Sequence, residues 1–235
     1  MSATQAVPAV NRLLTALPRK DREQLLANCE QIELVFGQEL CRSGEPIRHV
    51  YFPTGSFIYL LSPIDDNACL GMGMVGNEGM LGITLVLGVD IAPFHALVQG
   101  AGPALRMTTT AFIHQLEQSP ALQQALKRHL YLSMNQLGQA AACSHFHRVE
   151  ARLARWLLMT QDRAHSDGFH VTHVSLAFLL GVRRVGITKA ANSLQQKNLI
   201  SYRRGDIKIV DRTGLEAAAC GCYQANKKAY DQILK

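Results

Sequence analysis

The chain has 235 residues, 48% of them hydrophobic and 18% charged, which excludes a disordered protein and allows one large or two modest domains. The opening MSATQAVPAV lacks the pattern of a secretory signal, and the most apolar stretch, Met80–Val89, is too short to cross a bilayer, so we expect a cytoplasmic protein with no membrane partner. The net charge of +6 divides into −2 for residues 1–145 (9 Lys and Arg against 11 Asp and Glu) and +8 for residues 146–235 (15 against 7). That basic C-terminal part suits nucleic-acid binding or a solvated basic face.

The first hundred residues change in texture near Ile32. Val10–Leu34 carries leucines at helical spacing, and Pro18 divides this segment into two short helices. From Ile32 to Thr108, apolar runs alternate with Gly, Pro, Asn and Asp, which predicts a β-sandwich or a barrel-like roll. The strands expected there are Glu33–Phe36, His49–Phe52, Ser56–Ser62, Ala68–Val75, Ala96–Val98 and Ala104–Met107.

A long helix is predicted next. Ser119 is a suitable N-cap, with Pro120 at the first helical position. One apolar stripe then recurs at steps of three and four residues up to about His145. Such a stripe needs a partner, and we favour a seam between two copies of the chain over packing within one domain. The residues predicted for this dimer interface are Leu122, Leu126, Leu130, Met134, Leu137 and Ala141.

Residues 149–198 predict three further helices. Val149–Met159 is amphipathic, and Thr172 can cap a helix whose expected core face is Val174, Ala177 and Phe178, with Leu180 a further candidate. Gly181 falls where a tight turn between helices requires a positive φ angle. The last helix, from Arg183 or Arg184 to Lys197, would bury Ile187, Ala191 and Leu194. This spacing is typical of a helix-turn-helix.

A β-hairpin is predicted over Leu199–Val210, turning at Arg203–Asp206. Three helices followed by a hairpin make a winged helix. The outward side chains of the second helix favour DNA over a protein partner, because they suit base edges and phosphates and no acidic residue interrupts them. The predicted DNA-binding residues are Arg183, Arg184, Val185, Thr188, Lys189, Asn192, Arg203 and Arg204.

Catalytic and metal-binding patterns are weak. The six cysteines resemble neither a disulfide framework nor a zinc site, and Cys220-x-Cys222 alone is thin support for a metal. The histidines are dispersed, and no paired carboxylates or P-loop occur. We therefore expect no enzyme, no metal and no iron–sulfur cluster.

The whole chain, from about residue 12 to 215, resembles the Crp/Fnr family of bacterial regulators. The resemblance is carried by L-A-x-L-L-G-V-x-R at Leu176–Arg184 and by L-x-x-x-N-L-I at Leu194–Ile200. It implies an α+β protein with a cyclic-nucleotide-binding-like β-roll at residues 12–118, a dimerisation helix at 119–145 and a winged helix-turn-helix at 146–235. It also implies a homodimer on a near-palindromic operator in double-stranded DNA, with RNA polymerase as a possible partner.

The same resemblance assigns roles within the reading helix. Arg184 matches the guanine-reading arginine of the family, and Lys189 stands where a second arginine reads a base or touches phosphate. Val185 stands where many members have a glutamate that accepts from cytosine, so we expect a different half-site there. Arg203 and Arg204 would lie near phosphates.

The effector site that the resemblance implies is incomplete. Gly76, Glu78 and Gly79 resemble its glycine–glutamate part, while the position of the phosphate-binding arginine falls near Phe94 and His95. No Arg or Lys occurs between Arg48 and Arg106, so we do not expect cyclic AMP bound in the family manner. A protonated His95 could replace part of that charge, or ligate a haem, but a lone histidine is more often structural. The effector remains an unidentified small molecule or none. The alternatives are a true cyclic-nucleotide-responsive regulator and a winged-helix adaptor that binds protein.

Overall fold

The computed structural model describes residues 10–65, 68–164 and 166–233, which divide into two compact units. The first unit is formed by Met1–Tyr59 and Met74–Tyr131, and the second by Leu60–Gly73 and Leu132–Ile233. The sequence placed domain boundaries after residues 118 and 145, whereas this division falls within the long helix. Of the helices in the described ranges, none is long and apolar enough to cross a membrane.

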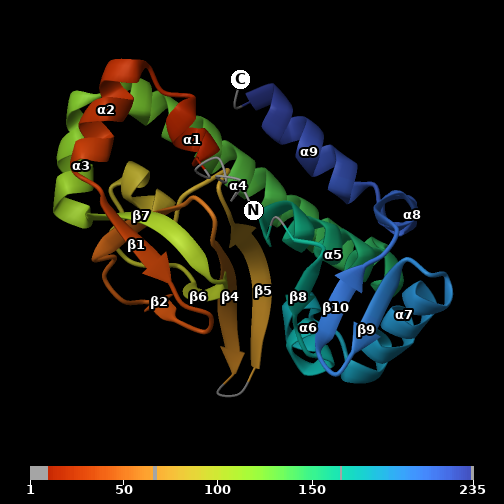
Figure 1. Ribbon diagram of the computed structural model, residues 1–235. Helices are drawn as coiled ribbons and strands as arrows, with labels where there is room; N and C mark the ends of the chain where they lie inside the picture. Colours follow the sequence, from red (N-terminus) through yellow and green to blue (C-terminus); the bar gives the residue numbers. More distant parts are fainter. Residues whose placement is uncertain (1–9, 66–67, 165, 234–235) are drawn as a thin grey trace, which may run out of the picture. The chain divides into compact units, whose positions relative to one another are not determined.

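The strands of the N-terminal half form two sheets, as the alternating apolar runs predicted (Figure 1). One sheet has the order β1-β7-β3 and the other β2-β6-β4-β5. Strand β7 pairs antiparallel with both β1 and β3, so it is the centre of the first sheet. The strands are β1 (Glu30–Leu34), β2 (Glu39–Cys41), β3 (His49–Pro53), β4 (Phe57–Asp65), β5 (Ala68–Val75), β6 (His95–Gly100) and β7 (Gly102–Thr108).

Short helices flank this roll. Asn11 caps the first of them, since its side chain accepts a hydrogen bond from the Leu14 N–H, and Pro18 starts the second. The predicted division at Pro18 is thus confirmed. These helices are α1 (Arg12–Thr15), α2 (Arg19–Ala27), the 3₁₀ helix η1 (Ile83–Leu87) and α3 (Thr109–Gln118). They close over an apolar core that includes Leu13, Leu14, Leu25, Val50, Phe52, Met80 and Phe112.

Three local details differ from the sequence prediction. Strand β1 begins and ends earlier than expected, because Val35 and Phe36 are 64% and 54% exposed in a turn that closes at Gly37, where φ is 79°. Strand β2 was not predicted, because three residues are too few for alternation to show. Helix α3 was also missed, although Thr108 caps it by accepting from the Ala111 N–H.

The long helix α4 spans Pro120–Phe146, as predicted. The Ser119 hydroxyl accepts from the Leu122 N–H at 3.0 Å, which is the expected N-cap. The interface prediction needs a correction at the start of α4. Leu122 and Leu126 are 1% and 0% exposed within the core of the roll, so they cannot also pack against a second copy of the chain. Farther along, Met134 and Ala141 are exposed, and Leu130 and Leu137 are half-buried.

The second unit is built around helix α5 (Val149–Ala164), whose buried residues include Leu153, Leu157 and Leu158. Helices α6 to α9 and a three-stranded sheet of order β8-β10-β9 surround it. Helices α8 and α9 were not predicted. The remaining elements are β8 (Gly168–His170), α6 (His173–Leu180), α7 (Arg184–Gln196), β9 (Ile200–Arg203), β10 (Asp206–Ile209), α8 (Arg212–Ala218) and α9 (Cys222–Ile233).

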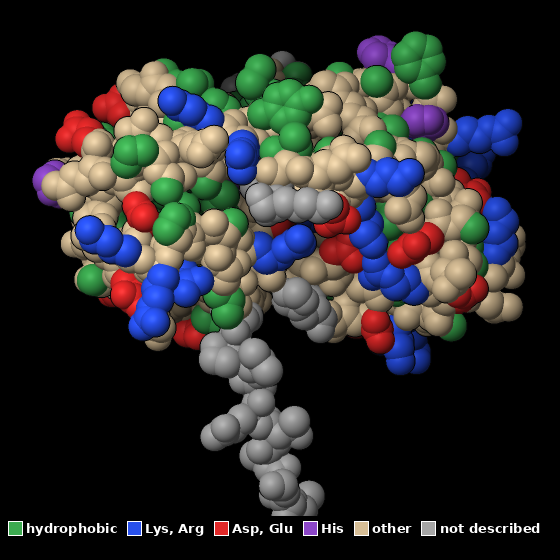
Figure 2. Space-filling model, turned by 90° about the horizontal axis from the view of Figure 1, so that it is seen from above, with side chains coloured by type: hydrophobic (Ala, Val, Ile, Leu, Met, Phe, Trp, Pro, Cys, Tyr) green, Lys and Arg blue, Asp and Glu red, His purple; other side chains and the backbone are tan. Residues whose placement is uncertain are grey.

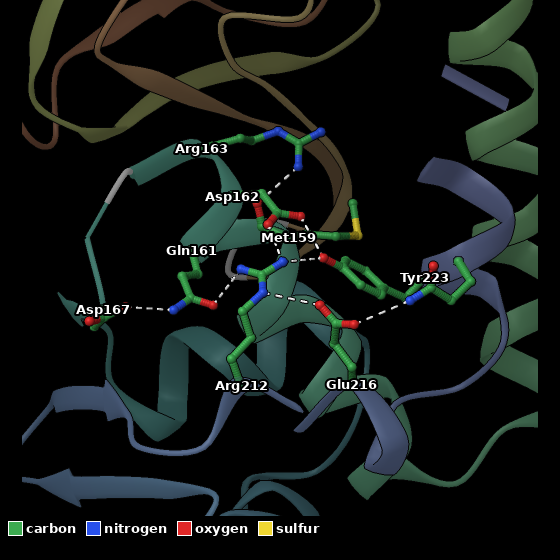
Figure 3. A network of polar contacts seen from close by, with 9 residues as sticks. Met159, Gln161, Asp162, Arg163, Asp167, Arg212, Glu216 and Tyr223 are labelled. Carbon is green, nitrogen blue, oxygen red and sulfur yellow. Dashed lines mark hydrogen bonds and ion pairs between the residues drawn. The ribbon is translucent and has the colours of Figure 1, made fainter. Parts of the chain in front are cut away.

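A polar network joins α5, α8 and α9 (Figure 3). Its centre is Arg212, which donates at 2.7 Å to Asp162 and at 2.6 Å to the hydroxyl of Tyr223. The same hydroxyl donates to Asp162 at 2.8 Å, so the three groups satisfy one another. Burial alone would lower the pKa of Arg212, but Asp162, Tyr223 and Glu216 together outweigh it and raise that pKa. The guanidinium therefore stays charged, and the C-terminal helices are fixed to α5.

Candidate nucleic-acid interface

Helices α6 and α7 form the predicted helix-turn-helix. Thr172 caps α6 by accepting from the Ser175 N–H at 3.1 Å, and Gly181 ends it with φ 61° and ψ 44°. That left-handed conformation disfavours any residue with a side chain, which explains the glycine. The predicted core face of α6 is wrong in part, because Val174 and Phe178 are 45% and 41% exposed. Leu176 and Leu180 are its buried residues, since α6 meets its neighbours through the adjacent face.

Helix α7 is fixed from its inner side. Ile187, Ala191 and Leu194 are buried as predicted, together with Ala190. At its C-terminal end Lys197 forms an ion pair of 2.6 Å with Glu150 of α5. These contacts determine which side of α7 faces outward.

The outward side of α7 carries most of the predicted reading residues. At 100° per residue, Arg184, Val185, Lys189 and Asn192 fall within an arc of roughly 140°. All four are exposed, and Val185 is 59% exposed although it is apolar. Arg183 precedes the helix as its N-cap residue, in an extended conformation. Two arginines therefore stand at the N-terminus of α7, where unpaired backbone N–H groups add positive potential.

Thr188 is only half-buried on this surface, and its hydroxyl is engaged. It donates to the Arg184 carbonyl at 3.2 Å and lies 3.1 Å from Nδ1 of His173. The His173 ring stacks on Tyr202 of β9, with centroids 4.3 Å apart and planes 13° apart. Thr188 thus links the reading helix to α6 and, through His173, to the wing. Sequence reasoning missed His173 and Tyr202, which touch only in three dimensions.

The wing is the hairpin of β9 and β10. Its two-residue turn has φ 52° at Arg204 and φ 94° at Gly205, as in a tight turn of the predicted kind. Arg203 and Arg204 are exposed there, and a groove on this sheet is lined by both arginines and by Lys208. Lys208 was not predicted. The acidic residue of the groove, Asp206, lies 2.8 Å from Nδ1 of His170.

The helix-turn-helix, residues 172–198, contains no Asp or Glu, but other parts of the molecule do. On the face that lies uppermost in Figure 1, Lys and Arg side chains stand among Asp and Glu side chains, as Figure 2 shows. Residues 146–235 also contain seven acidic residues, all outside α7, so their charge of +8 is not uniform along the chain. Along α7, by contrast, the first turn has no acidic residue.

Comparison with known proteins agrees with a helix-turn-helix in this part of the chain. Residues 151–218 match the family of the Crp-like helix-turn-helix domain. Solved structures match most of the chain, and several of them are transcriptional regulators of the Crp/Fnr family. The chain has the fold of the Crp/Fnr transcription regulators. The resemblance inferred from Leu176–Ile200 is thereby confirmed. None of the curated proteins matches the chain.

Three solved structures illustrate this Crp/Fnr fold. FixK2 from Bradyrhizobium japonicum is 11% identical and superposes with a TM-score of 0.69, over 82% of this chain and 98% of its own. A CRP/FNR-family transcriptional regulator from Thermus thermophilus is 20% identical, with a TM-score of 0.67 over 81% and 98%. The c-di-GMP responsive global regulator CLP from Xanthomonas campestris is 18% identical, with a TM-score of 0.66 over 82% and 99%.

The turn at residues 76–79, where the Crp/Fnr resemblance places part of an effector site, is occupied by the chain's own groups. Glu78 is 8% exposed, and its carboxylate accepts from the Gly76 N–H at 3.4 Å. The amide of Asn11 donates to the Gly79 carbonyl at 2.8 Å. His129 of α4 lies so close that a Cβ on Gly79 would stand 2.5 Å from its Cε1. The glycine is thus explained by this approach, and sequence reasoning missed both Asn11 and His129.

The other two predicted effector residues, Phe94 and His95, form hydrogen bonds with the segment that includes β2. His95 accepts from the Ser43 N–H at its Nδ1, at 3.2 Å. The carbonyl of Phe94 accepts from the thiol of Cys41 at 3.8 Å. The Nδ1 of His95 is consequently engaged with the loop that follows β2, which favours the structural role over a haem ligand at that atom.

Buried His129 makes stability depend on pH. Burial lowers the pKa of His129, although the charge of Glu78 opposes that shift. Its contribution to stability is therefore complete above the unfolded value of about 6.5 and is lost as pH falls below it. We expect the free energy of unfolding, measured by urea at pH 7.5 and 5.5, to fall on acidification. The loss should be smaller in His129→Gln, with exposed His114→Gln as the matched control. An equal loss in both variants would contradict this.

Proposed function

We propose that the chain is a sequence-specific DNA-binding transcription regulator. The observation that carries this is the outward face of α7, where Arg183, Arg184 and Lys189 are exposed with no acidic residue in the first turn. Arg is the usual reader of guanine in the major groove, and the exposed wing arginines suit flanking phosphates. A protein-binding adaptor has no need of this arrangement of fixed cations.

The second part of the proposal is a homodimer. Helix α4 has an exposed apolar strip, on which Met134 and Tyr131 are 64% and 58% exposed. Exposed Ala141 and half-buried Leu130 and Leu137 extend it. Paired through this strip, two chains would present two reading helices to half-sites about one helical turn apart, so the operator is near-palindromic.

Val185 gives the proposed operator a distinctive position. A valine side chain accepts no hydrogen bond, and the 59% exposure of Val185 supports a position at the reading surface. An apolar side chain there suits the methyl group of thymine rather than the amino group of cytosine. The half-site is therefore expected to differ at this base pair from that of members with a glutamate.

Any effector would act by shifting the population of DNA-competent dimers, without binding as cyclic AMP does in the family. Two features support this: the absence of Arg and Lys between Arg48 and Arg106, and the close packing of His129 on Gly79. The rival, a cyclic-nucleotide receptor, predicts heat on titration with cyclic AMP or cyclic GMP, whereas our proposal predicts none. RNA polymerase would be a partner of the DNA-bound dimer.

Selection from genomic DNA tests the proposal. The purified full-length chain is incubated with fragmented DNA from its host, and the retained fragments are sequenced. We expect one recurrent motif with two inverted halves whose centres are about 10 base pairs apart. A retained pool with the same sequence composition as the input would refute sequence-specific binding.

A further inference from the structure

Four potential metal ligands from two separate segments, 143–147 and 220–222, meet in the second unit. Cys143 lies in the last turn of α4, and His147 follows in the link to α5. Cys220 lies between α8 and α9, and Cys222 is the first residue of α9. Their three Sγ atoms and one imidazole nitrogen all lie within 4.8 Å of one another. The sequence showed only the close pair Cys220-x-Cys222, because the other two residues of the cluster, Cys143 and His147, are more than seventy positions away.

The distances suit four ligands around one ion. Sγ of Cys143 lies 3.6 Å from Sγ of Cys220, and Sγ of Cys222 lies 3.6 Å from Nδ1 of His147. Zinc bonds of about 2.3 Å to sulfur and 2.0–2.1 Å to nitrogen give a tetrahedron with edges of roughly 3.5–3.8 Å. A disulfide requires about 2.05 Å, and all the cysteines are free. The side chains are therefore spaced like ligands and not like a bonded pair.

The three sulfur atoms lie in a buried setting with positive charge nearby. Cys143, Cys220 and Cys222 are buried together, with Ala151 as their half-buried apolar neighbour. Arg152 and Arg155 are close enough for their charges to act on these sulfur atoms. Three thiolates and a divalent cation leave a net charge of −1, which an arginine can balance. Nε of Arg155 is buried and has no hydrogen-bond partner in the described part of the chain, so it is available as a donor to sulfur.

We propose that Cys143, His147, Cys220 and Cys222 bind one zinc ion in a structural Cys₃His site. Binding releases one proton from each thiol to solvent and leaves the neutral imidazole as the fourth ligand. Four protein ligands leave no open position for a substrate, and this set has one sulfur too few for the usual Cys₄ ligation of an iron–sulfur cluster. The ion would tie the loop between α8 and α9 to the junction of α4 and α5.

The residues offer variants with matched controls. His147 is exposed, so His147→Ala removes a ligand without opening the core, and His145→Ala is its control on the same turn. Cys222→Ser removes a sulfur, and Cys69→Ser is its control, since half-buried Cys69 lies outside the cluster. Even the loss of an outer-shell partner weakens metal binding about 10–100-fold, so loss of a ligand should weaken zinc binding by more than about 100-fold.

The test uses the purified full-length chain. Elemental analysis should find one zinc per chain in the protein and both controls, and less in His147→Ala and Cys222→Ser. Cobalt in place of zinc should give the intense visible bands of a tetrahedral thiolate site. A chelator should lower the Tm of the protein but not that of His147→Ala. Failure of the metal-free chain to bind added zinc would overturn the proposal. So would bound iron in place of zinc, or a Cys143–Cys220 disulfide as the resting state in mass spectra.

Discussion

Arg184→Ala should weaken binding to the operator by about 1–3 kcal/mol per half-site and remove the preference at one base pair. Arg184 is exposed at the first position of α7, next to Arg183. A guanidinium placed there can donate two parallel hydrogen bonds to a guanine, which alanine cannot replace. The symmetry of a dimer doubles the loss, since both half-sites are affected. Fluorescence anisotropy with the selected operator, and with variants at each position, measures the affinity and the specificity.

Arg204→Ala is the control for this prediction. Arg204 is exposed at the tip of the wing, where contact with phosphate carries no sequence information. We expect it to weaken binding to every sequence alike and to reduce the slope of log K against log salt by about 1. If Arg184→Ala behaved in the same way, with unchanged preference at every base pair, Arg184 would be a phosphate contact and not a reader.

Leu126→Ala should destabilise the chain by about 2–5 kcal/mol, because it opens a cavity in the core of the roll. Leu126 is 0% exposed within the cluster that contains Phe52 and Phe112. The loss comes from packing within one chain. Urea unfolding of the variant should therefore show it at every protein concentration.

Met134→Ala is the matched variant on the same helix. Met134 is 64% exposed, so within one chain its truncation should change stability by no more than about 0.5 kcal/mol. In the proposed dimer it lies at the seam, and light scattering should show dissociation at higher protein concentration than for the unaltered chain. If Leu126→Ala dissociated the dimer and left the stability of the monomer unchanged, Leu126 would belong to the dimer interface, as the sequence predicted.

The helix-turn-helix could be predicted from the sequence because its constraints are local. Gly181 has the positive φ that the turn requires, and Ile187, Ala191 and Leu194 recur at helical spacing. Thr172 and Ser119 act as the expected caps. Each of these features depends on residues only a few positions apart, so the order of residue types along the chain is enough to predict it.

The sequence predictions were wrong where packing between distant parts of the chain determines which side chains are buried. The spacing of Leu122 and Leu126 predicts an apolar stripe but not which partner covers it, and the roll of the same chain does so. Likewise, the sequence of α6 is apolar on nearly all sides, so its period could not show that Val174 and Phe178 stay exposed. The contact of His129 with Gly79 and the cluster around Cys143 join residues fifty or more positions apart, and only the fold brings them together.

The most direct measurement compares the affinity of the chain for its selected operator with that for a scrambled duplex of equal length and composition, at one physiological salt concentration. We expect the operator to bind at least about 10³-fold more tightly, as specific regulators do. Equal affinities would mean that the cations of α7 and the wing bind only phosphate, and would contradict a sequence-specific regulator.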